Sequence, residues 1–231
     1  IIMQNITISN QYKFSVLNIN LIRMLVIACA ALFISSLAYA DDKITVFAFG
    51  DSLTAGYGLP PGEGFTAQLE AKLQEKHQNI QVINAGVSGD TTSGGKSRLA
   101  WVIDSLVKQP DIAILELGAN DGLRAIDPDI TRTNLAWIIE AFQSRNIPIL
   151  LTGMLAPPNL GSDYGNQFNA VFPELAKEYD VDFYPFFLEG VAADPGLNQA
   201  DGIHPNAQGV SIIVERITPY VLDTLNGKNI D

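Results

Sequence analysis

Three residues that lie far apart in the chain, Ser52, Asp201 and His204, carry the side chains that acyl-transfer chemistry requires. A serine hydroxyl is a weak nucleophile until a neutral imidazole accepts its proton. Of the two histidines, His77 lies in a polar stretch typical of the solvated end of a helix, so His204 is the predicted base. Asp201 precedes His204 by three residues in a glycine-containing loop, a spacing that lets its carboxylate accept the Nδ1 proton. The three residues therefore predict nucleophilic attack on a carbonyl carbon.

An attacked carbonyl develops a negatively charged oxygen, which hydrogen-bond donors must stabilise. The candidate donors are the backbone N–H groups of Ser52 and Gly89 and the side-chain amide of Asn120. Plainer explanations exist for each residue taken alone: Gly89 and Asn120 are common in turns, and Asp201 could cap a helix that begins at Pro205 or form an Asx turn. The chemical interpretation therefore requires that the fold bring all of them together.

The elements that would position these residues follow from the hydrophobic pattern, in which short apolar runs alternate with longer amphipathic stretches. We expect strands at Ile44–Phe49, Ile80–Asn84, Ile112–Leu117, Ile147–Thr152 and Val181–Phe186. We expect helices at Phe65–His77, Gly95–Lys108, Ile130–Arg145, Asn166–Glu178 and Asn206–Leu225. We also expect Asp129 or Thr131 to cap the third helix and Pro205 to lie in the first turn of the last.

This order of elements predicts an α/β fold, a three-layer α/β/α sandwich around a doubly wound, parallel five-stranded sheet of the flavodoxin-like type. Ligands of such sheets bind at the carboxyl ends of the strands. Four polar segments follow or adjoin these ends, at residues 50–53, 86–90, 118–121 and 201–204. The candidate residues therefore converge on one edge of the predicted sheet.

These four segments, in this order, resemble the motif blocks of the GDSL, or SGNH, hydrolase family. The resemblance covers most of residues 44–225 and implies the three-layer fold and no cofactor. It implies that Ser52 is the nucleophile, that Asp201 and His204 complete the catalytic set, and that Ser52, Gly89 and Asn120 form the oxyanion hole.

Within the family, residues 50–57, 116–124, 155–161 and 201–206 are similar to the group of multifunctional thioesterase I, lysophospholipase and arylesterase. The similarity implies a small-molecule ester or thioester as the substrate. It also implies that the acyl group contacts the loop that contains Met154, Leu155, Ala156 and Pro157. Two other functions stay open at this point: a carbohydrate O-acetyl esterase of the same family, and a non-catalytic protein that binds lipid in the same cleft.

Composition restricts the remaining possibilities. The chain has 231 residues and a formal net charge of −11, which disfavours nucleic acid as a partner. The single cysteine, Cys29, lies in the predicted leader, so thiolate metal sites and disulfides are not expected, and two distant histidines predict no metal site. The Ser93–Ser97 stretch resembles a phosphate loop, but Asp90 replaces its first glycine and a helix start is predicted instead. No Gly-x-Ser-x-Gly motif of the α/β-hydrolases occurs.

The first forty residues differ from the rest of the chain. They contain no Asp or Glu, and a basic Arg23 precedes an apolar run that ends in Ala38-Tyr-Ala40. This pattern predicts a signal peptide cleaved after Ala40, followed by a single domain at residues 41–231 in the periplasm or outside the cell. The apolar run is shorter than the roughly 20 residues of a spanning helix, so no stable membrane anchor is expected after cleavage. No heptad pattern is present, and a monomer is the default expectation.

Overall fold

A computed structural model describes residues 43–227 of the chain, and the predicted signal peptide lies outside the described residues. The described part contains a five-stranded sheet in the order β2-β1-β3-β4-β5, and every neighbouring pair is parallel. The strands are β1 (Ile44–Gly50), β2 (Ile80–Gly86), β3 (Ile112–Glu116), β4 (Ile149–Thr152) and β5 (Asp182–Tyr184). This order is that of a flavodoxin-like, doubly wound sheet, which confirms the predicted fold class.

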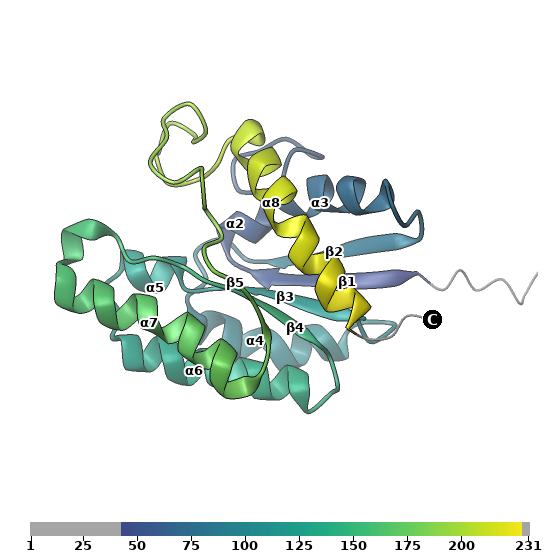
Figure 1. Ribbon diagram of the computed structural model, residues 1–231, viewed down its shortest axis with the longest axis horizontal. Helices are drawn as coiled ribbons and strands as arrows, with labels where there is room; N and C mark the ends of the chain where they lie inside the picture. The colour runs from purple at the N-terminus through teal and green to yellow at the C-terminus, as the bar shows by residue number, and fades with distance from the viewer. Residues whose placement is uncertain (1–42, 228–231) are drawn as a thin grey trace, which may run out of the picture. The chain divides into compact units, whose positions relative to one another are not determined.

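Helices cover both faces of the sheet and complete the three layers (Figure 1). One face carries α2 (Ser52–Ala55), α3 (Phe65–Gln74) and α8 (Ala207–Asn226), and the other carries α4 (Thr92–Asp104), α6 (Pro128–Gln143) and α7 (Ser162–Tyr179). The short helices α5 (Ala119–Leu123) and η1 (Pro158–Leu160) follow β3 and β4. Within residues 43–227, no helix combines the length and the apolar character of a membrane span.

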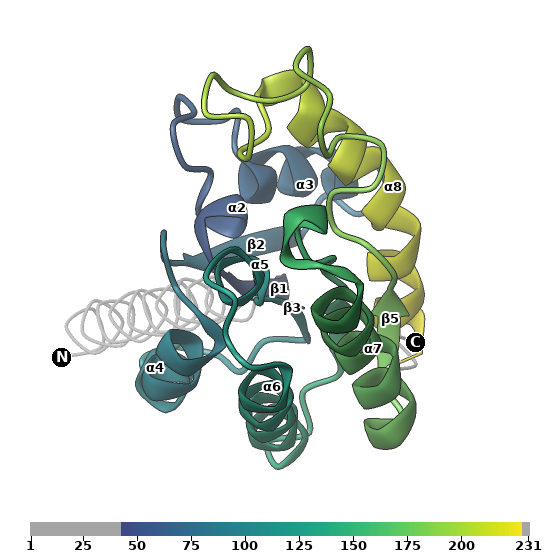
Figure 2. The same ribbon diagram turned by 90° about the vertical axis from the view of Figure 1, so that its left-hand side faces the viewer.

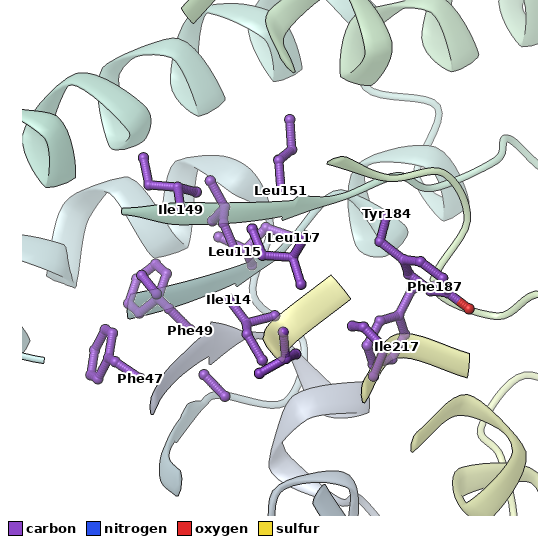
Figure 3. Packing of buried hydrophobic residues seen from close by; sticks show 14 of the residues in the cluster. Phe47, Phe49, Ile114, Leu115, Leu117, Ile149, Leu151, Tyr184, Phe187 and Ile217 are labelled. Carbon is purple, nitrogen blue, oxygen red and sulfur yellow. The ribbon is translucent and has the colours of Figure 1, made fainter. Parts of the chain in front are cut away.

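The core lies between the central strands and the helices, as the apolar runs predict. Phe47 and Phe49 are fully buried and point to the same side of β1, because alternate strand residues face the same way. Both rings pack edge-on against Phe142 of α6, with ring centroids 6.2 Å apart in each pair. Figure 3 shows them with the buried residues of β3 and β4. This packing fixes the sheet on which the site is built.

Strand register brings the polar segments to one edge of the sheet. Gly50 at the end of β1 pairs with Gly86 at the end of β2 and with Glu116 at the end of β3. The three strands therefore end level, and the segments that follow them begin side by side. The chain leaves β1 toward β2 and leaves β3 toward β4, so the two connections diverge. Helices α2 and α5 lie at this edge and face the viewer in Figure 2.

Capping side chains set helix boundaries that hydrophobic periodicity alone places less well. Helix α6 begins at Pro128 because the side chain of Asp127 accepts a hydrogen bond from the backbone N–H of Asp129, so the predicted caps Asp129 and Thr131 are wrong. Helix α8 is capped by Asn206, and Pro205 precedes it instead of lying in its first turn. Helix α4 begins at Thr92, three residues earlier than predicted, and this confirms that the Ser93–Ser97 stretch starts a helix.

Candidate active site

The position of Ser52 is determined by the sharp turn between β1 and α2. Ser52 is the first residue of α2, and the side chain of Asp51 caps that helix by accepting a hydrogen bond of 3.0 Å from the N–H of Leu53. The helix ends after one turn at Gly56, whose φ of 78° is in the left-handed region that favours glycine. Ser52 is thus held on a rigid turn at the carboxyl edge of the sheet, and it lines a cavity there.

The structure brings Ser52, His204 and Asp201 into one hydrogen-bonded series. The Oγ atom of Ser52 lies 2.9 Å from Nε2 of His204, and Nδ1 of the same ring lies 2.7 Å from Oδ2 of Asp201. The other carboxylate oxygen of Asp201 accepts hydrogen bonds of 3.0 Å from the backbone N–H groups of Ile203 and His204. Asp201 therefore forms an Asx turn, which was the alternative role considered for it, and its carboxylate also binds the imidazole.

These hydrogen bonds determine the charge of Asp201. The backbone N–H of His204, then its imidazole and the N–H of Ile203, lower the pKa of the Asp201 carboxyl to about 2. Asp201 is consequently ionised at neutral pH. An ionised carboxylate at Nδ1 favours the imidazole tautomer whose Nε2 can accept a proton from Ser52.

Two residues that the sequence left without a role hold the histidine loop in place. The backbone N–H of Gln199 donates to the carbonyl of His204 at 2.7 Å, and its side-chain amide donates to the carbonyls of Tyr57 and Pro205. The ring of Tyr57 packs on the imidazole with centroids 4.6 Å apart. Tyr57 was part of a recognised motif, whereas nothing in the sequence pointed to Gln199.

Gly89 and Ser52 present backbone donors at the same edge. Gly89 has a φ of 86°, in the left-handed region, and a Cβ atom there would meet only Nη2 of Arg124, at 3.8 Å. Backbone conformation, more than lack of space, therefore requires glycine at this position. Within the described residues, neither the N–H of Gly89 nor that of Ser52 has an acceptor. Gly89 is further held by Arg124, which donates to its carbonyl at 3.0 Å.

Asn120, the third predicted donor, lies in the first turn of α5 and also lines the cavity. Its Nδ2 atom donates to Oδ2 of Asp51 at 3.1 Å and to the carbonyl of Asp90 at 3.0 Å. Burial raises the pKa of the Asp51 carboxyl to about 6, against the lowering effect of its hydrogen bonds. The amide is thus oriented by two protein acceptors, and a substrate oxyanion would share Nδ2 with them.

The two aspartates beside the predicted site residues, Asp51 and Asp121, order the surrounding loops. Asp51 caps α2 and receives the Asn120 amide. Asp121 is fully buried and accepts hydrogen bonds from the N–H and hydroxyl of Thr92 and from the hydroxyl of Thr131. His77 is exposed and lies three residues beyond Gln74, the last residue of α3. Among the described residues, no three His, Cys, Asp or Glu side chains lie where they could hold a metal ion.

A cavity of about 560 Å³ opens beside Ser52 and His204. The four loop residues that the resemblance implies contact the acyl group, Met154 to Pro157, all line this cavity. Other apolar residues that line the cavity were not identified from the sequence, among them Tyr57, Leu123, Phe186, Leu188, Ile203 and the pair Ala192 and Ala193. Except for Leu123 at the end of α5, they come from loops whose conformation has no periodic signature, so only the tertiary structure assigns them to the cavity.

The loop that contains Met154–Pro157 is tied to the fold by one side chain of α7. The Oδ1 atom of Asn169 accepts a hydrogen bond of 2.8 Å from the backbone N–H of Ala156. Pro157 packs beside Gly122 of α5, where a Cβ atom would lie 3.5 Å from the proline Cδ. The loop therefore has a defined place over the cavity, close to the segment that carries Asn120.

The fold and the site together define a three-layer α/β/α hydrolase with a Ser-His-Asp arrangement at the carboxyl edge of a parallel sheet. Comparison with known proteins gives the family. Residues 48–212 match the model of the GDSL-like Lipase/Acylhydrolase family. The chain belongs to this family, as a hydrolase of the SGNH esterase and thioesterase type. This confirms the resemblance seen in the motif blocks.

Individual relatives agree with this assignment. The chain is 39% identical over 182 residues to the Thioesterase 1/protease 1/lysophospholipase L1 of Escherichia coli strain K12, which covers 79% of the chain and 85% of the relative. It is 35% identical over 192 residues to an arylesterase of Vibrio mimicus, covering 83% and 94%. The crystal structure of AlinE4, an SGNH-hydrolase family esterase, matches with a TM-score of 0.68 and 49% identity, covering 80% of this chain and 97% of that one.

Proposed function

We propose that the chain hydrolyses carboxylic esters and thioesters through an acyl-enzyme on Ser52. The observation that carries this proposal is the contact of 2.9 Å between the Ser52 hydroxyl and Nε2 of His204, with Asp201 at the opposite ring nitrogen. In the first step His204 accepts the hydroxyl proton while Oγ forms a bond to the acyl carbon. The carbonyl electrons move onto oxygen, near the donors of Ser52, Gly89 and Asn120.

Collapse of this tetrahedral intermediate breaks the bond to the leaving alcohol or thiol, which takes the proton from His204. In the second step His204 accepts a proton from water, and the hydroxide oxygen bonds to the acyl carbon. Breakdown returns the proton to Oγ of Ser52 and releases the carboxylic acid. Every proton is exchanged with the imidazole or with solvent, so Ser52, His204 and water are sufficient for the proton transfers of the reaction.

The cavity is lined largely by apolar side chains, which supports binding of an apolar acyl group there. Its volume of about 560 Å³ falls within the roughly 300–1,000 Å³ typical of small-molecule sites. Met154, Leu155, Ala156 and Pro157 are the proposed contacts of the acyl chain. The names of the relatives, an arylesterase and a thioesterase with lysophospholipase activity, support ester and thioester substrates.

A fluorophosphonate probe tests the role of Ser52 directly. The purified wild-type protein should be labelled on Ser52, and Ser52→Ala should lose both the label and turnover of an aryl ester, by on the order of a millionfold if the triad acts as a unit. Ser88→Ala is a matched control because Ser88 also lines the cavity but has no contact with His204. Labelling that persists in Ser52→Ala would refute the assignment.

A substrate panel separates the proposed activity from the two other functions considered above. Aryl esters of rising chain length, an acyl-CoA, a lysophospholipid and an acetylated glycan would be compared with the same enzyme. Preference for the glycan would favour an O-acetyl esterase, and binding of acyl groups without turnover would favour a lipid-binding protein. We expect turnover of the aryl esters and the thioester.

We further propose that the protein is exported and acts as a monomer. The basic Arg23, the apolar run and Ala38-Tyr-Ala40 support cleavage after Ala40, which would leave 12 basic and 25 acidic residues and a net charge of −13. N-terminal sequencing of the protein from the periplasm or culture medium should begin at Asp41. Size-exclusion chromatography with light scattering would check the oligomeric state.

A further inference from the structure

Glu116 is a fully buried carboxyl group behind the Ser52 turn that the proposed mechanism does not use. It is the last residue of β3, directly opposite Gly50 of β1. Its Oε2 atom accepts a hydrogen bond of 2.7 Å from the hydroxyl of Thr54 and one of 3.3 Å from the backbone N–H of Asp51. These two residues flank Ser52 and Leu53, so one carboxyl oxygen contacts both sides of the nucleophile turn.

The shape of the turn is adapted to this side chain. A Cβ atom on Gly50 would lie 2.5 Å from Oε2 of Glu116 and 2.1 Å from Oγ1 of Thr54, closer than real Cβ contacts. The absence of a side chain at Gly50 therefore gives the glutamate its place beneath the turn. The segment that carries Ser52 and the strand end that carries Glu116 are thus fitted to each other across the sheet.

The surroundings of Glu116 favour its neutral form. Burial, and then the nearby Asp51 carboxylate, raise its pKa well above the usual value for a glutamate. Burial also raises the pKa of the Asp51 carboxyl, to about 6. Asp51 also lies near His204 and near Asp90, and Asp90 is paired with Arg98 at 2.6 Å. Among the described residues, Oε1 of Glu116 has no hydrogen-bond partner, a situation that costs less for a neutral carboxyl than for a charged one.

We propose that Glu116 is a positioning residue for the nucleophile, whose buried carboxyl group holds the turn that brings the Ser52 hydroxyl to the His204 imidazole. This inference rests on the proposed acyl-enzyme mechanism. Glu116 does not line the cavity and contacts no substrate, so its effect passes through Thr54 and Asp51. Asp51 in turn orients the amide of Asn120. Ionised Glu116 would add a second buried negative charge beside Asp51 and loosen this arrangement.

Two substitutions at position 116 distinguish the effect of an uncharged hydrogen-bond acceptor from the effect of merely filling the space. Glu116→Gln keeps an uncharged acceptor for Thr54 and Asp51, so kcat should stay within about threefold of wild type. Glu116→Leu removes the acceptor and should lower kcat about a hundredfold, the scale of a nucleophile misplaced by about an ångström, with KM nearly unchanged because the cavity is intact. Equal losses in the two variants would overturn the proposal.

A pH profile tests the requirement for the neutral form. As the pH rises and Glu116 begins to ionise, the wild type should lose kcat relative to Glu116→Gln, because the glutamine at position 116 cannot ionise beside Asp51. Profiles of the same shape in the two proteins would overturn this requirement. A merely structural contact would change stability without producing this difference.

Thr54→Val gives a second measurement that does not depend on the folding of Glu116→Leu. It removes the hydroxyl donor to Oε2 and should lower kcat about fivefold, the scale of one hydrogen bond, with KM unchanged. Thr224→Val is the matched control, because Thr224 is equally buried but its hydroxyl bonds to the carbonyl of Tyr220 in α8. Equal kcat values for Thr54→Val, Thr224→Val and wild type would contradict the proposal.

Fluorophosphonate labelling keeps this inference distinct from the proposed function. If Ser52 is the nucleophile, wild type and Glu116→Gln should be labelled at similar rates and Glu116→Leu more slowly, while Ser52→Ala is not labelled at all. Labelling of Ser52→Ala would refute the mechanism itself. Equal labelling rates for wild type and Glu116→Leu, with Ser52→Ala unlabelled, would refute only the role of Glu116.

Discussion

The ring of Tyr57 lies against the imidazole of His204, with ring centroids 4.6 Å apart and a tilt of 38° between the planes. The tyrosine carbonyl is bound by the side chain of Gln199, which also binds Pro205 next to the histidine. Tyr57 is half exposed, whereas the His204 side chain against which it packs is only 15% exposed. In the proposed mechanism, an aromatic face at this place stabilises the imidazolium that forms when Ser52 gives its proton to His204.

Removing the Tyr57 ring should therefore reduce kcat. For Tyr57→Ala we expect a loss of about three- to tenfold, corresponding to an aromatic contact worth about 0.5–1.5 kcal/mol. Tyr57→Phe keeps the ring and should stay close to wild type. Steady-state kinetics with a short aryl ester, whose acyl group is small, measures the effect. Similar kinetics for the alanine and phenylalanine variants would show that the ring has no role.

Asn120→Ala should lower turnover about 10²–10³-fold if the amide stabilises the oxyanion. The amide also binds Asp51 and Asp90, so thermal unfolding must accompany the kinetics. A matched control is Asn134→Ala, since Asn134 is a buried amide that bonds to Thr92 and Ser93 away from the cavity. A kinetic loss no greater than that of the control would indicate that Asn120 only orders its loop.

The stability contributed by Asp201 should decrease in acid. Its pKa is lowered to about 2 from the ordinary 3.8 of an aspartate, so the folded protein holds this proton less tightly than the unfolded chain. The contribution is therefore present above the unfolded pKa and is lost as the pH falls through about 4 toward 2. Asp201 is partly exposed to solvent, which screens the interaction and keeps the effect modest.

Denaturant unfolding of the wild type and Asp201→Asn across this acidic range measures the difference. We expect the stability gap between the two proteins to narrow as the pH falls. Asp51 has the opposite sign, because its raised pKa means that the folded state binds the proton more tightly, but it contributes equally to both proteins and cancels. A gap that does not change with pH would contradict the assigned shift.

Ala156→Leu should shorten the acyl chains that the enzyme accepts. Ala156 lines the cavity and its backbone is held by Asn169, so a larger side chain would fill space that a long chain needs. We expect acetyl esters to be hydrolysed almost as in the wild type and decanoyl esters to lose about tenfold or more in kcat/KM, the scale of displaced methylenes in an apolar pocket. Ala100→Leu, at an exposed position of α4, is the control. An unchanged chain-length profile would place the acyl chain elsewhere.

The sequence by itself determined the fold class and the identities of the predicted site residues. Buried parallel strands are short and apolar on both faces, so β1, β3 and β4 were visible in the hydrophobic pattern. The carboxyl ends of such strands meet at one edge, which is why segments as distant as those of Ser52 and Asn120 could be expected together. The family resemblance added the roles of these residues, and the short α2 and α5 were not predicted at all.

Only the tertiary structure decided how the side chains contact one another. The contact of Ser52 with His204 spans 152 positions and depends on a histidine loop held by Gln199, which no local pattern reveals. Glu116 lies in a segment that the sequence recognised, but its raised pKa depends on burial and on Asp51, which only the packed structure reveals. Hydrophobic periodicity specifies which face of an element is buried, whereas loop conformation, and the contacts of a side chain with distant residues, arise only when the elements pack.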